Sequence, residues 1–199
     1  PLQDPTQMWE SCMEMDIITW GNTRHSPNLR SAAQIVVDLV EVAAGAGNLL
    51  LNTGPMPDGR INPIEEQRIR EAGGWLKRHG DCIYGSRRSP LGRMGVMGSA
   101  NRHARWIGTS DPCVHHLATL CWTGTEFFTV LVEGDVLDVT CLETGKPVSF
   151  TRGPVGRLTF TGLPETPPDA LSSVFRVRFA MPPRLMDAKA DGAWLEGGI

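Results

Sequence analysis

The sequence predicts an α/β segment followed by an all-β segment, because its character changes near residue 86. Before that point, helical apolar periods alternate with short apolar runs in the order strand, helix, strand, helix, which is typical of parallel α/β architecture. After it, short β-rich runs separated by Gly and Pro follow one another, as in antiparallel sandwiches. We therefore expect three regions: an α/β domain over residues 1–88, an antiparallel β-sandwich over 89–182 and a loosely ordered tail over 183–199.

Two short runs in the first region are predicted to be strands. Residues 8–15 form the first, and the glycine-bounded apolar run 48–54 has the pattern of a strand buried on both faces, as in a parallel sheet. The alternation of a strand places four side chains of the first run on one face, namely Met8, Glu10, Cys12 and Glu14. Two parallel strands cannot cover their own edges, so this segment looks like the closing part of a larger barrel or sheet.

Two helices are predicted between and after these strands. The first covers residues 27–44, with Ser26 as its N-cap and Pro27 in the first helical position. The second begins after Asn62, which is also followed by proline, and we expect it to end at Gly80. Both helices are thus bounded by the residues that commonly start and stop helices.

The second region is predicted to be β-rich throughout. Its apolar runs are "ATLCW", "EFFTVLVEG", "VLDVTCLE", "RLTFTGL" and "SVFRVRFAM". Trp106 and Trp122 would bind carbohydrate if they were exposed on this sandwich, but packing between the sheets is the favoured prediction for both.

Composition excludes some classes of function. The formal charge of -3 and a pI near 6.0 argue against binding to nucleic acid, and no apolar run approaches the ~20 residues that span a bilayer. The five cysteines include no C-x-x-C pair. A loose cluster of Cys113, His115, His116 and Cys121 lacks the paired spacing of structural zinc sites, so we expect ordinary strand and loop residues there. The opening "PLQDPTQ" has no initiator methionine, and we expect the chain to be part of a longer protein.

Glu10 is the main candidate for chemistry. If it lies between Met and Trp surfaces, its carboxylate is partly desolvated, and desolvation raises a carboxyl pKa toward the value that a general acid needs. Glu14 shares its predicted face but lies about 13 Å along the strand, and Asp16 lies farther still. Neither carboxylate on this strand is therefore close enough to Glu10 to form a pair with it.

The words "MWESCMEMDIITWGN" and "GAGNLLLNTGPMPDGRINPIEEQRIREAGGWLKRHGDCIYGSR" lie in order within residues 8–87. Together they resemble the late barrel segment of the α-L-fucosidases of glycoside hydrolase family 29. In that family Trp-Glu-x-Cys precedes Ser-Trp-Gly-Tyr, and an Asn-Leu-Leu-Leu-Asn-Ile-Gly-Pro strand leads into a helix. After residue 90 only the architecture agrees, since the family usually carries a C-terminal β-sandwich.

This resemblance implies the C-terminal portion of a (β/α)8-type barrel and a retaining hydrolase of terminal α-L-fucosyl linkages. Glu10 would be its acid/base, and Trp20 and Trp9 would contact the sugar. Three positions in these words depart from the family pattern: Thr19 stands where the family has Ser, Asn22 where it has Tyr and Thr53 where it has Ile. The family's nucleophilic Asp and sugar-binding His residues come from earlier strands, so we expect this chain alone to be inactive.

The resemblance also implies the surroundings in which such an enzyme works. A fucosylated glycan would be the substrate, without cofactor or metal, and the enzyme would be secreted, periplasmic or lysosomal. The alternative is a noncatalytic β-sandwich module that binds a glycan or a partner and lacks a complete active site.

Overall fold

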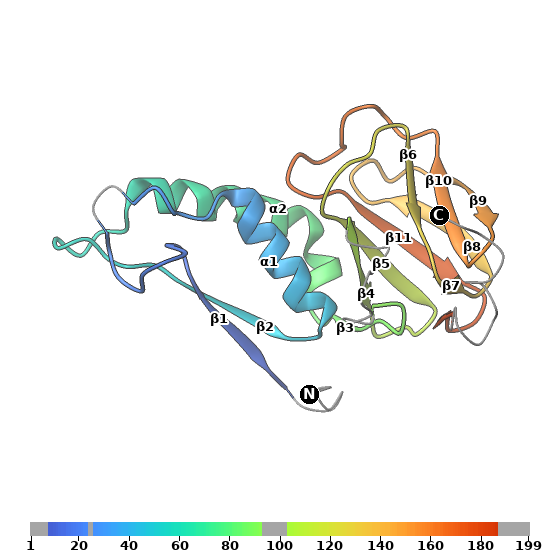
Figure 1. The fold of residues 1–199 in the computed structure, drawn as a ribbon, viewed down its shortest axis with the longest axis horizontal. Helices are drawn as coiled ribbons and strands as arrows, with labels where there is room; N and C mark the ends of the chain where they lie inside the picture. Colours follow the sequence, from blue (N-terminus) through green and yellow to red (C-terminus); the bar gives the residue numbers. More distant parts are fainter. Residues whose placement is uncertain (1–7, 24–25, 93–102, 187–199) are drawn as a thin grey trace.

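The computed structural model describes residues 8–23, 26–92 and 103–186. Two helices and a pair of strands extend from a β-sheet part, as Figure 1 shows. The order strand, helix, strand, helix is confirmed from Glu10 to Ile83. In chain order the elements are β1 (Glu10–Glu14), α1 (Ala32–Ala44), β2 (Asn48–Asn52) and α2 (Pro63–Ile83). Neither helix among the described residues is long and apolar enough to cross a membrane.

The strands β1 and β2 are parallel, as the sequence predicts. Their register pairs Glu10 with Asn48 and Glu14 with Asn52, so both strands end at the same edge. Leu51 and Met15 pack into a core shared with the two helices, whereas Leu50 on the alternate face of β2 is 48% exposed. The helices therefore cover one face of the pair and leave the other open.

Helix α1 begins later than residue 27. Ser31 is its N-cap, and a capping box joins Ser31 to Gln34. The preceding residues cannot be helical because their backbone groups pair with the chain after β1: Ile17 N–H donates to Asn28 O and Arg30 N–H to Met15 O. The hydroxyl of Ser26, the predicted N-cap, accepts from the Asn28 N–H within a turn instead.

Helix α2 starts as predicted and ends three residues later than Gly80. Asn62 accepts from Ile64 N–H, which confirms the predicted N-cap. The backbone leaves helical geometry at His79 (φ -118°, ψ 18°), and the helix then continues to Ile83. The prediction of an end at Gly80 was therefore wrong, since the helix kinks at His79 and then continues through Gly80.

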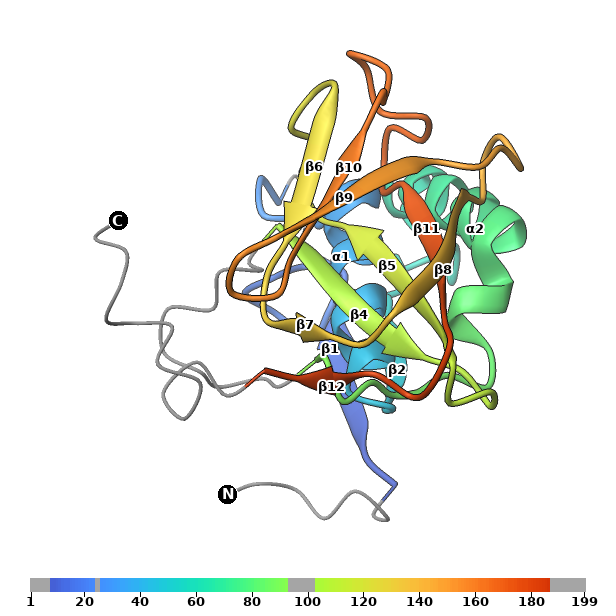
Figure 2. The ribbon, with the colours of Figure 1, turned by 90° about the vertical axis from the view of Figure 1, so that its right-hand side faces the viewer.

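The remaining strands form antiparallel sheets (Figure 2). A five-stranded sheet has the order β3-β4-β5-β11-β8, and a three-stranded sheet the order β6-β10-β9. A short pair, β12-β7, closes one end. Their bounds are β3 (Arg87–Arg88), β4 (Ala104–Gly108), β5 (Val114–Thr119), β6 (Glu126–Thr129), β7 (Val132–Glu133), β8 (Val136–Cys141), β9 (Ser149–Gly153), β10 (Arg157–Thr161), β11 (Val174–Phe179) and β12 (Arg184–Leu185).

Two cores lie on the two faces of the five-stranded sheet. One core fills the space between the two larger sheets, with the rings of Phe127, Phe160 and Phe175 in mutual contact. On the other face, Ile107 and Val174 pack with the helices α1 and α2. The helices are therefore a layer between the β1–β2 pair and the five-stranded sheet.

Four strands were not anticipated from the sequence. The strands β3, β4 and β9 lie outside the predicted strands and apolar runs, and β12 lies in the segment predicted to be a loose tail. Arg184 in β12 donates to Glu133 in β7 at 2.5 Å, and this ion pair helps to fix the short strand on the β part. The prediction of a loose tail was wrong for residues 184–185, and residues 187–199 lie outside the described part.

Candidate active site

The open face of the β1–β2 pair carries the residues that the sequence singled out. In the parallel register, Glu10 lies beside Asn48 and Cys12 beside Leu50, and all four are exposed. Glu14 lies beside Asn52 at the carboxyl end of the pair and is buried. The face thus changes along its length from an exposed carboxylate to a buried one.

Glu10 is the first residue of β1 and is exposed. Met8, which was expected to help desolvate it, is itself 89% exposed. The expectation of a desolvated Glu10 is therefore wrong for the described residues. The register partner of Glu10 on β2 is an amide, Asn48, and not a second carboxylate.

Trp9 makes a structural contact on the side of the sheet opposite to Glu10. Its indole Nε1 donates to the Gly45 carbonyl at 2.9 Å. The ring fills the space beside Gly47, where an added Cβ would lie 2.4 Å from a ring atom. Neighbouring side chains of a strand point to opposite faces, so Trp9 and Glu10 do not converge. The role of Trp9 in binding a sugar stays a prediction.

Trp20 lies in the loop after β1 and is 61% exposed, so it is not a core aromatic. Its loop rests against the end of β2: a Cβ added at Gly54 would lie 2.3 Å from the Asn22 nitrogen and 2.4 Å from the Gly21 carbonyl carbon. Gly54 is therefore needed for this close approach. Trp20 belongs to the carboxyl rim of the strand pair, whereas Glu10 is at the other end of β1, about 13 Å away along the strand.

Three buried carboxylates gather at this rim. The Asn52 amide donates to the Glu14 carboxylate, and Asp16 accepts from the Ile18 N–H at 3.0 Å. Glu65, in the first turn of α2, is 3% exposed, and its Oε2 has no hydrogen-bond partner among the described residues. Burial, reinforced by the charges of Glu14 and Asp16, raises the pKa of Glu65 above its ordinary value.

The sequence did not identify this group as a site. Glu65 stands in the first turn of α2, where an acidic residue commonly complements the helix N-terminus. Asn52 and Glu65 come from elements that are 38 and 51 residues after Glu14 in the sequence, so only the fold brings them together. The sequence did hold a signal for part of this group. Glu14 lies near the end of one predicted strand and Asn52 near the end of the next, and parallel strands end at the same edge of a sheet.

The other predicted groups do not form sites. His115 and His116 are adjacent on β5 and point to opposite faces, so they cannot share a ligand. No cluster of His, Cys, Asp and Glu in the described ranges could hold a metal ion. Trp106 is buried and Trp122 stacks on Phe127 and Phe175, which confirms core packing for Trp106 and leaves Trp122 half-buried at the core edge.

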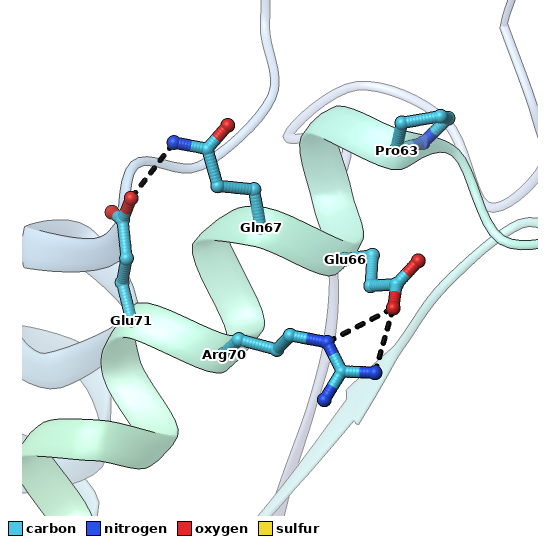
Figure 3. Close-up of a pocket in the computed structure, with 5 residues that line it drawn as sticks. All are labelled: Pro63, Glu66, Gln67, Arg70 and Glu71. Atoms are coloured by element: carbon cyan, nitrogen blue, oxygen red, sulfur yellow. Dashed lines mark hydrogen bonds and ion pairs between the residues drawn. The ribbon is translucent and has the colours of Figure 1, made fainter.

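A shallow hollow on α2, shown in Figure 3, lies on the outer surface of the helix. Its polar side chains pair with one another: Arg70 donates to Glu66 at 2.7 Å, and Gln67 donates to Glu71 at 2.9 Å. These one-turn pairs are typical of a solvated helix face. The hollow therefore offers no convergent groups for chemistry.

Comparisons with known proteins agree on one family. Residues 1–81 match the family model described as α-L-fucosidase. The bovine tissue α-L-fucosidase is 28% identical over 175 residues, which cover 86% of this chain and 36% of that protein. The human plasma α-L-fucosidase is 41% identical over 78 residues, 38% of this chain and 17% of that one. The crystal structure of a Thermotoga maritima α-fucosidase superposes with a TM-score of 0.72 at 27% identity, covering 87% of this chain and 40% of that one.

These similarities place the chain among the relatives of glycoside hydrolases. More narrowly, the chain is related to the C-terminal part of the α-L-fucosidases, as the motifs in residues 8–87 predicted. It spans well under half of the length of the relatives that it matches.

Proposed function

We propose that this chain forms the C-terminal part of an α-L-fucosidase that hydrolyses terminal α-L-fucosyl linkages of glycans with retention of configuration. The observation that carries the proposal is the family match over residues 1–81, which includes both Glu10 and Trp20. In this proposal the β1–β2 pair and its helices are the last units of a (β/α)8 barrel. The open face of the pair is the barrel interior, and the two larger sheets are the C-terminal sandwich.

Glu10 is proposed as the acid/base of a double displacement. A nucleophilic carboxylate attacks the anomeric carbon while the Glu10 carboxyl gives its proton to the departing glycosidic oxygen. In the second step, the Glu10 carboxylate takes a proton from water, whose oxygen attacks the same carbon and releases the nucleophile. We propose that this nucleophile lies in a part of the enzyme that the chain does not include. The exposed indole of Trp20 would line the sugar pocket and cover the 6-deoxy methyl group.

The test uses the natural gene product that contains residues 1–199 and a chromogenic α-L-fucoside. We expect retention of configuration by NMR of the first-formed product. Glu10→Gln should lower turnover by about a hundredfold or more, and azide should restore it, because azide needs no general base. Glu71→Gln, an exposed carboxylate on α2, is the matched control and should behave like the wild type.

Glu14→Gln separates the two carboxylates on the same face of β1. If azide restores turnover to Glu14→Gln but not to Glu10→Gln, the acid/base is at the buried rim and the assignment of Glu10 fails. The 199-residue chain on its own should show no turnover. Hydrolysis by this chain that depends on Glu10 would contradict the proposal that the nucleophile is elsewhere.

A further inference from the structure

A second candidate site lies on the five-stranded sheet, away from the β1–β2 pair. A hollow of about 500 Å³ is lined by Val114 of β5, Asp138 of β8, and Arg176 and Arg178 of β11. The hollow lies on the face of the sheet that the helices partly cover. At the other end of β11, Val174 on this same face is buried against the helices. The arginines are exposed because the helices cover only part of this face.

The hollow holds an excess of positive charge. Arg178 is fixed by Asp138, with its Nε 2.7 Å and its terminal nitrogen 2.5 Å from the same carboxylate oxygen. The side chain of Arg176, two residues earlier on the strand, makes no hydrogen bond or ion pair with any described residue. Two guanidinium groups therefore face one carboxylate, and the donors of Arg176 are free for a ligand.

His116 does not line the hollow but lies beside Arg176, which is its register partner on β11. Its side chain is buried, with the residue 5% exposed, and its Nδ1 has no hydrogen-bond partner among the described residues. Burial, together with the charge of Arg176, lowers the pKa of His116 to about 4, although Asp81 at the end of α2 opposes this shift. The neighbouring His115 has a weak effect in the same direction as Arg176. The imidazole is thus neutral at pH 7 and keeps an unused polar atom.

We propose that this hollow, which we call the Arg176 pocket, binds an oxyanion, the sulfate group of an acidic saccharide. A guanidinium matches the planar pair of acceptor oxygens of such a group, and its charge strengthens both hydrogen bonds. The hollow is larger than a bare ion needs and lies within the size range of pockets for small organic ligands. The saccharide class rests on the proposed function, whereas the oxyanion chemistry rests on the pocket alone.

The experiment measures binding to the 199-residue chain by calorimetry at low ionic strength, since salt screens exposed charges. The probes are galactose 6-sulfate, sodium sulfate and galactose. We expect galactose 6-sulfate to bind saturably and more tightly than sodium sulfate, and galactose not to bind. Arg176→Gln should weaken binding of the ester at least about tenfold, as the loss of a charge-assisted hydrogen bond does. Arg184→Gln, which removes an exposed arginine of β12, is the charge-matched control and should bind normally.

Lowering the pH from 7 to 5 gives an independent readout. A bound anion favours the protonated imidazole of His116, so binding should become tighter as the pH falls, and His116→Gln should lose this dependence. The absence of saturable binding by the ester, or an equal loss in Arg184→Gln, would overturn the site. Sodium sulfate binding as tightly as the ester would refute the saccharide as its source. Either result is independent of the fucosidase assay, which probes Glu10 on another face.

Discussion

At the scale of single residues, two glycines decide where Trp9 can lie. Gly45 and Gly47 follow α1, and the indole occupies the space that their side chains would fill. The carboxylate and the indole that are adjacent in the sequence are thereby separated, with Trp9 toward the end of α1 and Glu10 on the open face. The pattern of the strand predicted this alternation, but only the fold shows what each side chain contacts.

Gly47→Ala should destabilise the chain. The new Cβ would lie 2.4 to 2.7 Å from three atoms of the Trp9 ring. The ring cannot easily move away, because its Nε1 is hydrogen-bonded to the Gly45 carbonyl. Overpacking of this kind costs about 1–3 kcal/mol, which a lower urea midpoint would report. Gly73→Ala in α2 is the matched control: its Cβ meets no atom within 4 Å, and it should stabilise the helix by about 0.5–1 kcal/mol. Equal midpoints for Gly47→Ala and the wild type would contradict this interpretation.

At the scale of elements, helix α2 is held against the β part by its last turns. The Trp75 indole donates to Ser172 O at 2.7 Å. Asp169 Oδ2 accepts from Arg78 at 2.6 Å and lies 3.3 Å from His79 Nε2. His79 is also the residue at which the helix kinks. These contacts explain why Gly80 does not end the helix, since packing against a distant loop outweighs a local stop signal.

Asp169→Asn should therefore weaken the attachment of α2. Burial alone would raise the pKa of Asp169, but the Leu171 N–H and the Arg78 and His79 side chains outweigh it, so the pKa lies below its ordinary value. A lowered carboxyl pKa contributes stability that is present above the unfolded value and is lost as the pH falls below about 4. Since the Arg78 side chain is 56% exposed, we expect a loss of about 1–3 kcal/mol at pH 7 by urea denaturation.

The control for this substitution is Asp138→Asn, which removes a carboxylate from the exposed pair with Arg178. Exposed pairs contribute about 0–1 kcal/mol, so this variant should remain close to the wild type. Below pH 4 the gap between Asp169→Asn and the wild type should narrow, because the carboxyl is protonated first in the unfolded chain and then in the native chain as the pH falls through its lowered pKa. A constant gap from pH 7 to pH 3 would assign the loss to something other than this charge.

Local sequence signals predict some elements of this fold, whereas tertiary contacts determine others. The parallel strands and the start of α2 were predictable because glycine-bounded apolar runs and an Asn-Pro cap are local signals. The start of α1 was not, because residues 28–30 pair with the chain after β1, and this pairing competes with helix formation. The place of Glu65 beside the other rim carboxylates could not be predicted, since Glu65 meets Glu14 only after α2 has packed beside the strands.

At the scale of the whole molecule, the layers differ in how well they are covered. The five-stranded sheet has a core on each face, and its central strands carry some of the most buried side chains, including Leu117 and Phe175. Within the described residues, β1 and β2 pair only with each other, and their outer face exposes Leu50. Local stability should therefore fall from the β part toward the strand pair.

Hydrogen exchange tests this gradient directly. The slowest amides of Glu10–Glu14 and Asn48–Asn52 should exchange about a hundredfold faster than those of Val114–Thr119 and Val174–Phe179, because opening the pair exposes little buried apolar surface. Leu50→Gln should leave this pattern unchanged, since the side chain that it replaces is already half exposed. Uniform protection across residues 8–80 and the β part would mean that the open face is covered in solution, and the strand pair would then be as stable as the sheet that anchors it.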